Sequence, residues 1–167
     1  MTTTRLGFSV WTEKDITLAK ELWGDPQVSK YICAAGIFTE EEIEARLALE
    51  CENGKTHGIQ YWPIFDLESG RHVGCCGLRP VAGEKGAFGL GFHLRPAFWG
   101  KGLAVEGARA VITYAKETLG AVRLHAGHNP NNMNSRHVLI DKLGFTYTGD
   151  QFYAPTGLMH PSYILEL

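Results

Sequence analysis

Two glycines flank a lysine at Gly100-Lys101-Gly102, where a predicted strand ends and a long helix begins. The start of a helix exposes unpaired backbone N–H groups and carries partial positive charge, so it attracts phosphate groups. Glycine has no side chain and lets the backbone approach a ligand closely, and Lys101 adds a cation. This pattern favours binding of a phosphate or diphosphate group.

The same pattern has a simpler explanation, because Gly100 and Gly102 could merely turn the chain into the helix. It is neither the phosphate-binding loop of ATPases nor a complete dinucleotide fingerprint, whose third glycine would fall at Val105. On these residues alone, the turn is the favoured interpretation of the two.

A second polar segment, residues 129–135, lies between a short apolar strand and a helix. Its simplest role is helix capping, with Asn132 as the N-cap and Ser135 as its N3 partner. Taken singly, this segment is best explained by capping. Capping does not require so many asparagines or Pro130, so a ligand-binding role stays open.

The apolar periodicity predicts the elements that carry these segments. Thr39 followed by three glutamates is a strong helix start, and Asn53-Gly54 is the expected stop of that helix. The order of elements predicts a mixed α+β domain with helices packed on one sheet. Strands are expected at 6–10, 58–67, 71–78, 87–94, 122–126, 145–152 and 162–167, and helices at 15–23, 40–51, 104–119 and 136–143.

The composition fits one globular domain over residues 1–167, with 44% hydrophobic and 20% charged residues. The net charge of −2 argues against a nucleic-acid partner, which would require an excess of Lys and Arg. The four cysteines form no C-x-x-C pair, so no metal site is expected. No apolar run approaches about 20 residues, and the polar residues 1–5 lack the apolar region of a signal peptide. We therefore expect a cytoplasmic protein with no membrane partner.

Taken together, four segments resemble the GNAT N-acetyltransferases in order and spacing, and most closely their RimJ/RimL-like branch. These segments are residues 91–96, 99–104, 132–135 and 142–145, and the resemblance covers almost the whole chain. It implies a central, mostly antiparallel, twisted sheet of about seven strands that splay in the middle, with about four helices. It also implies acetyl transfer from acetyl-CoA to a primary amine, a protein N-terminus or a small molecule, by a monomer or homodimer.

The resemblance also assigns candidate residues for binding acetyl-CoA. In the family, the consensus Q/R-x-x-G-x-G/A binds the diphosphate of CoA through backbone N–H groups, and the strand before it pairs with the pantetheine arm. The strands at 87–94 and 122–128 would splay apart beside the thioester. The implied residues are Phe92, His93 and Leu94 for the arm, Trp99, Gly100, Lys101, Gly102, Leu103 and Ala104 for the diphosphate, and Asn132 and Ser135 beside them.

The sequence departs from the family at two catalytic positions. Ile140 stands where many relatives carry a tyrosine as general acid, and Gly89 stands where many carry a glutamate base. Ser135 is therefore the candidate acid that protonates the departing thiolate, and His93 is a candidate catalytic base. The remaining base candidates are His125, His128 or a chain of water molecules.

Direct attack in a ternary complex needs no covalent enzyme intermediate, so Cys75 and Cys76 are expected to be core residues. The oxyanion requires a fixed donor, most simply a backbone amide near His93 or Leu94. The two departures favour one alternative function, a non-catalytic acyl-CoA-binding or regulatory module. A nucleotide-phosphate-binding enzyme is a third possibility that leaves the 132–135 segment unexplained.

The acceptor amine is not specified by the sequence. Aromatic residues are core residues by default, but the resemblance implies that the first two helices and neighbouring strands form the acceptor pocket. We therefore hypothesise that Trp23, Tyr31 and Phe38 shape this pocket. Tyr153 and Tyr163 are further candidates for its lining.

Overall fold

The computed structural model describes residues 1–167 and contains one seven-stranded sheet in the order β1-β2-β3-β4-β5-β7-β6. All neighbouring strands are antiparallel except β4 and β5, which are parallel. The strands are β1 (Leu6–Phe8), β2 (Tyr61–Asp66), β3 (His72–Pro80), β4 (Ala87–Leu94), β5 (Arg123–Gly127), β6 (Thr146–Tyr153) and β7 (Leu158–Glu166).

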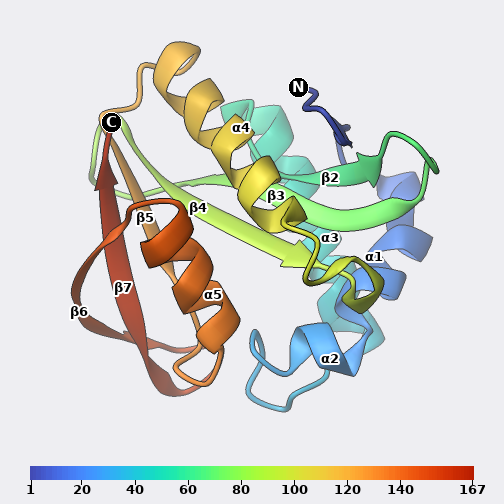
Figure 1. The fold of residues 1–167 in the computed structure, drawn as a ribbon. Coiled ribbons are helices and arrows are strands. Elements are labelled where there is room, and N and C mark those ends of the chain that lie inside the picture. Colours follow the sequence, from blue (N-terminus) through green and yellow to red (C-terminus); the bar gives the residue numbers. More distant parts are fainter.

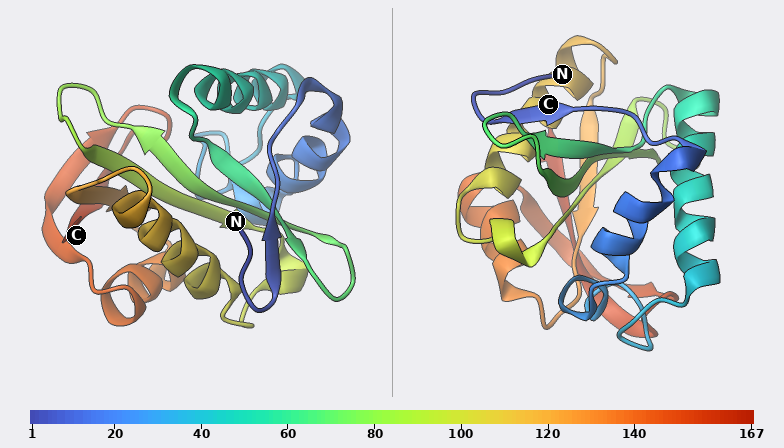
Figure 2. Two further views of the ribbon diagram at one scale, coloured as in Figure 1. Left: turned by 90° about the horizontal axis from the view of Figure 1, so that it is seen from above. Right: turned by 90° about the vertical axis from the view of Figure 1, so that its right-hand side faces the viewer.

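Five α-helices cover the two faces of this sheet (Figure 1). They are α1 (Ile16–Trp23), α2 (Pro26–Ser29), α3 (Glu40–His57), α4 (Leu103–Glu117) and α5 (Met133–His137). Figure 2 shows α4 and α5 on one face, and α1 and α3 on the other. Short 3-10 turns lie at Glu13–Asp15 and Pro96–Phe98, and a π turn at Val138–Lys142 continues α5. None of the helices combines the length and apolar character needed to cross a lipid bilayer.

The hydrophobic core is divided by the sheet, and two adjacent cysteines mark the division. Cys76 belongs to the cluster beneath α4, and Cys75 belongs to the cluster beneath α1 and α3. Successive residues of a strand point to opposite faces, so neighbouring thiols enter different halves of the core. Both are fully buried, which confirms their expected place in the core.

The strands β4 and β5 pair only at their beginnings. Their three residue pairs are Ala87 with Arg123, Phe88 with Leu124, and Gly89 with His125. Beyond these pairs the strands diverge, as Figure 1 shows, and the edge of β4 from Leu90 to Leu94 has no strand partner on that side. The predicted splay is confirmed, and we call this opening the β4–β5 fork.

The structure differs from the sequence prediction at several element ends. The prediction that α3 stops at Asn53-Gly54 is wrong: the helix continues to His57 and ends at Gly58, which adopts a left-handed φ of 69°. The extra helix α2 begins where a stop was expected, because Asp25 caps the N–H of Gln27 and proline suits the first helical turn. The last strand is longer than predicted and starts at Leu158, and α5 begins at Met133 rather than Arg136.

A buried histidine makes the stability of the fold sensitive to acid. His72 is 4% exposed, neither ring nitrogen makes a hydrogen bond, and the ring packs against Trp11 and Phe65. Burial lowers its pKa to about 4, and the backbone of Gly74 offsets only part of this effect. The unfolded chain binds this proton at about pH 6.5, so acid below that pH favours the unfolded state.

We therefore expect His72 to cost the protein roughly 2–3 kcal/mol of stability between pH 6.5 and pH 4. The free energy of unfolding, measured by urea denaturation at pH 7.5 and 4.5, should fall less in His72→Phe than in the wild type. The other histidines are present in both proteins, so the difference isolates this one. Equal losses in the two proteins would contradict the assignment.

Candidate active site

The start of α4 presents a row of free backbone amides. The N–H groups from Gly100 to Val105 donate to no protein acceptor, and the first bonded amide is that of Glu106, which donates to the Gly102 carbonyl at 3.1 Å. Gly100 and Gly102 have φ values of 72° and 74°. Such successive free amides form a concave anion site, which the helix dipole reinforces. We call residues 100–105 the amide loop.

The amide loop is fixed to the end of β4 and to the N-terminal segment. The Trp99 indole donates to the Leu94 carbonyl at 2.7 Å. Arg5 donates from Nη1 to the Lys101 carbonyl at 2.9 Å and from Nε to a Glu106 carboxylate oxygen at 2.6 Å. These contacts hold the loop in place without using its free N–H groups.

Glu106 accepts the hydrogen bonds that hold the N-terminal segment against the amide loop, a role that the sequence prediction missed. Its Oε1 accepts from the Arg5 amide at 2.9 Å and from the Thr3 hydroxyl at 2.6 Å. Burial raises the pKa of Glu106, but the hydrogen bonds from Thr3 and Arg5 outweigh it and hold this pKa below its usual value. The carboxylate therefore stays ionised and keeps its partners.

The other predicted residues come from β4 and from the segment that follows β5. Phe92, His93 and Leu94 lie on the unpaired part of β4. After β5, the Asn132 side chain caps α5 by accepting from the Ser135 N–H at 3.1 Å, as predicted. The Ser135 hydroxyl makes no hydrogen bond within the protein, so it remains free to donate.

Of the two histidines on or after β5, the structure brings only one to the fork. His125 pairs with Gly89 at the closed end, where its Nε2 lies 2.9 Å from a Glu84 carboxylate oxygen. His128 follows β5 at the open end and is buried. Its Nδ1 donates to the Asn129 carbonyl at 2.7 Å, so its Nε2 accepts from the Tyr163 hydroxyl at 2.9 Å. Burial lowers the pKa of His128.

The side chain of His93 points to the face covered by α1 and α3. The Trp23 indole, which can only donate, lies 3.2 Å from His93 Nδ1. Burial, and then the cations of Arg46 and Arg79, hold the pKa of His93 well below its ordinary value. The ring is therefore neutral with its proton on Nε2. In this state His93 offers a hydrogen-bond donor rather than a base.

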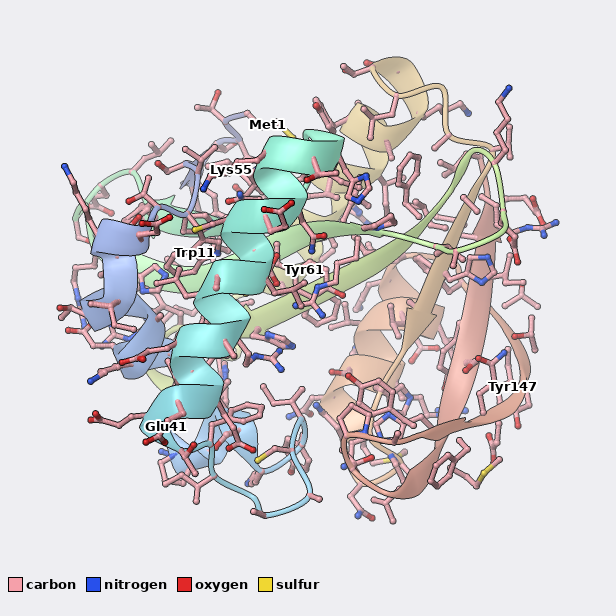
Figure 3. The ribbon with its side chains drawn as sticks, turned by 180° about the vertical axis from the view of Figure 1, so that it is seen from behind. Met1, Trp11, Glu41, Lys55, Tyr61 and Tyr147 are labelled. Carbon is pink, nitrogen blue, oxygen red and sulfur yellow. The ribbon has the colours of Figure 1, made fainter.

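Beside His93 lies a charged cluster that the sequence prediction missed. Arg79 pairs with Glu50, which is fully buried, and its guanidinium lies 4.3 Å from the centre of the Tyr61 ring. Figure 3 shows Tyr61 between α3 and the sheet. Its ring fits there because a Cβ at Gly91 would come within 2.3 Å of it. Burial raises the pKa of Tyr61 to about 12, so its hydroxyl stays protonated.

Two of the three aromatic residues hypothesised to shape the acceptor pocket meet at Arg46, beside this charged cluster. Trp23 and Phe38 both lie against the guanidinium of Arg46. Tyr31 instead lies beneath its neighbour Lys30. Tyr153 stacks on His160 in the β6–β7 hairpin, at a ring separation of 4.7 Å.

The family comparison agrees with this architecture. The acetyltransferase (GNAT) domain family matches residues 5–146, which include the β4–β5 fork and the amide loop. The chain belongs to the GNAT acetyltransferase family. The predicted seven-stranded GNAT fold and the predicted class of N-acetyltransferase are confirmed, with five α-helices instead of about four.

Several GNAT relatives are similar over much of the chain. An uncharacterised N-acetyltransferase, p20 of Bacillus licheniformis, is 25% identical over 147 residues, 88% of this chain and 82% of that protein. The [ribosomal protein uS5]-alanine N-acetyltransferase of Escherichia coli is 31% identical over 107 residues, 64% of this chain and 55% of that enzyme. The FsC-acetyl coenzyme A-N(2)-transacetylase of Aspergillus fumigatus is 33% identical over 123 residues, 69% of this chain and 52% of its own length.

Solved GNAT structures share the whole fold. The GNAT-family acetyltransferase of Bacillus anthracis superposes with a TM-score of 0.81 at 24% identity, covering 99% of this chain and 97% of that one. RimL, a ribosomal L7/L12 alpha-N-protein acetyltransferase solved with coenzyme A, superposes with a TM-score of 0.82 at 15% identity. That match covers 100% of this chain and 97% of RimL.

Proposed function

We propose that this GNAT protein transfers the acetyl group of acetyl-CoA to a primary amine by direct attack in a ternary complex. The observation that carries the proposal is the amide loop, with its free N–H groups from Gly100 to Val105 beside the unpaired edge of β4. A diphosphate needs such a row of fixed donors, and an extended amide-bearing arm needs an open strand edge.

The residues that would bind acetyl-CoA follow from these two features. The amides of Gly100, Lys101, Gly102, Leu103 and Ala104 would hold the diphosphate, with Trp99 fixing the loop to β4. Phe92, His93 and Leu94 would hold the pantetheine arm on one side of the β4–β5 fork. Asn132 and Ser135 would close the other side. When bound there, acetyl-CoA supplies the thioester as the acyl donor.

Acetyl transfer involves two proton transfers. The amine nitrogen forms a bond to the acetyl carbon as the carbon–sulfur bond breaks, so the amine loses one proton and the thiolate gains one. We assign the second proton to the free hydroxyl of Ser135, which regains a proton from the one that the amine releases, so no net proton is consumed. His93 carries its proton on Nε2 and is suited to donate a hydrogen bond to the developing oxyanion, together with a backbone amide of β4.

The amine must therefore reach the site as the free base or lose its proton to another group. His128 is the remaining histidine candidate for this role, because it lies at the open end of the fork and burial keeps it neutral at physiological pH. A chain of water molecules is the other candidate. With either candidate as the base, we expect the rate of acetyl transfer to rise with the fraction of acceptor amine that is uncharged.

Replacing Ser135 with alanine tests the assigned acid. We expect kcat to fall on the order of 100-fold, the low end for general acids, because a thiolate is already a good leaving group. The Kd for acetyl-CoA should change little, since the cap uses the Ser135 backbone N–H. Ser135→Thr, which keeps the hydroxyl, should retain most of the rate. An unchanged kcat in the alanine variant would remove Ser135 from the mechanism.

A non-catalytic acyl-CoA-binding module is the second candidate, favoured by Ile140 and Gly89 at the two departures from the family pattern. Two measurements separate the candidates. Acetyl-CoA at 100 times its Kd should stabilise either protein by about 2.7 kcal/mol, which is visible as a higher Tm. Only an enzyme should release free CoA thiol when amines are added. The absence of any Tm shift would contradict both candidates.

We also propose that the protein acts in the cytoplasm as one domain, as a monomer or homodimer. The four cysteines are free and buried, which fits a reducing compartment. Size-exclusion chromatography with light scattering distinguishes the two oligomeric states.

A further inference from the structure

Arg46 of α3 is a half-buried cation with no anionic partner. The chain has three other half-buried arginines, Arg79, Arg95 and Arg123, and each forms an ion pair with a glutamate. None of the nitrogens of Arg46 donates to a protein oxygen, and its Nε is fully buried. The two terminal nitrogens are not fully buried, so they remain reachable for a ligand.

The guanidinium of Arg46 lies against two aromatic rings, Trp23 and Phe38, on the α1 and α3 side of the sheet. Its Cζ is 5.3 Å from the centre of the Trp23 ring and 4.8 Å from that of Phe38. The same Trp23 indole donates to His93 on the unpaired part of β4. Arg46 and His93 therefore both contact the Trp23 side chain, which puts the cation near the strand that would hold the thioester.

The charges around Arg46 do not compensate it. Arg79 and the buried Glu50 neutralise each other as an ion pair. Burial, and then the cation of Arg79, hold the pKa of Arg46 below its usual value, and the carboxylate of Glu50 offsets only part of this effect. Contacts with aromatic faces return only about 2 kcal/mol, whereas removing a charge from water costs several kcal/mol. The site therefore retains one unbalanced positive charge, which an anionic ligand would neutralise.

We propose that the acceptor amine carries a carboxylate, as an α-amino acid does, and that this carboxylate pairs with Arg46 in the ternary complex. The inference rests on the proposed acetyl transfer and specifies its substrate class. The planar fork of a guanidinium matches a carboxylate with two parallel hydrogen bonds. The flanking rings hold the fork in position, so little side-chain entropy is lost when the acid binds.

Matched pairs of acceptors test this proposal. L-Phenylalanine, L-methionine and L-alanine are each compared with the corresponding carboxamide, and CoA thiol release is followed at saturating acetyl-CoA. Rates are compared at equal concentrations of uncharged amine, because the amide lowers the amine pKa. We expect kcat/KM to be at least tenfold higher for the acids, with the difference mainly in KM.

Substitution of Arg46 links that preference to the guanidinium. Arg46→Gln should bring the acid-to-amide ratio of kcat/KM within about threefold of one, and Arg46→Lys should retain part of the preference. Lys116→Gln is the control for net charge, because Lys116 is exposed and has no ion pair. It should leave the ratio unchanged.

The possible failures are distinguishable. Thiol release from acids and amides at equal efficiency in the wild type would overturn the role of Arg46 and leave acetyl transfer intact. An unchanged ratio in Arg46→Gln would do the same. If acetyl-CoA binds but none of the acceptors causes thiol release, the proposed function is overturned and this inference with it. If Arg46→Gln does not fold, competitive inhibition of the wild type by 3-phenylpropanoate but not by its amide supports the pairing, and equal inhibition overturns it.

Discussion

Replacing Glu50 with glutamine is expected to lower the free energy of unfolding by about 3–5 kcal/mol. Glu50 is fully buried, pairs with Arg79, and accepts from the Tyr61 backbone N–H at 2.8 Å. Glutamine has nearly the same shape but no charge, so it leaves the half-buried Arg79 guanidinium without a counterion. This single residue connects α3 to β2 and β3, so its loss should destabilise the whole fold.

A double-mutant cycle separates the energetic effect of losing the ion pair from the effect of disturbing the surrounding packing. Removing both charges in Glu50→Gln with Arg79→Met should cost clearly less than the sum of the two single substitutions, because no unpaired charge remains. Glu44→Gln on the exposed face of α3 is the control and should change stability by less than about 0.5 kcal/mol. Urea denaturation of the four proteins of the cycle and of the Glu44→Gln control gives the values. A loss below 1 kcal/mol for Glu50→Gln would contradict the assignment.

Replacing Gly100 with aspartate is expected to weaken acetyl-CoA binding about 10- to 100-fold relative to replacement with asparagine. Gly100 has a φ of 72°, and nothing lies within 4 Å of a Cβ built there. Aspartate and asparagine both tolerate this conformation, so the two variants should fold alike. They differ only in charge, and the carboxylate repels a diphosphate on the amide loop.

The expected magnitude follows from electrostatics. Two unit charges 4 Å apart interact by about 4 kcal/mol at the effective dielectric of a protein surface, and solvent exposure of the loop reduces this further. Calorimetric Kd values for acetyl-CoA at low and high salt measure the difference, which should shrink as salt is added. Equal Kd values for the two variants would show that the amide loop does not hold the diphosphate.

The sequence predicts well those features whose signals are local. The capping box at Thr39, the cap from Asn132 to Ser135 and the seven strands all depend on residues close together in the chain. The amide loop is predictable for the same reason. Element ends are predicted less well: Asp25 and Pro26 end one helix and begin another, and sequence alone does not decide between these roles.

The charged cluster could not be assembled from the sequence, because its members come from α3, β2, β3 and β4. One signal was available. Arg46 and Glu50 fall on the same helical spacing as the buried residues Ile43 and Leu47, and charges on an apolar face require partners. The tautomer of His93 could not be predicted from the sequence either, since it depends on Trp23, 70 residues away in the chain.

The small junction between β4 and β5 has a thermodynamic consequence. Three residue pairs are the only strand pairing between the N-terminal four strands of the sheet and the C-terminal three. The sheet therefore consists of two units that meet at a narrow seam, and the core beneath α4 is shared by both units. A molecule seated in that seam contacts both units only while they are docked. Its binding free energy then becomes part of the docking free energy, and occupancy of the β4–β5 fork and the stability of the sheet are one coupled equilibrium.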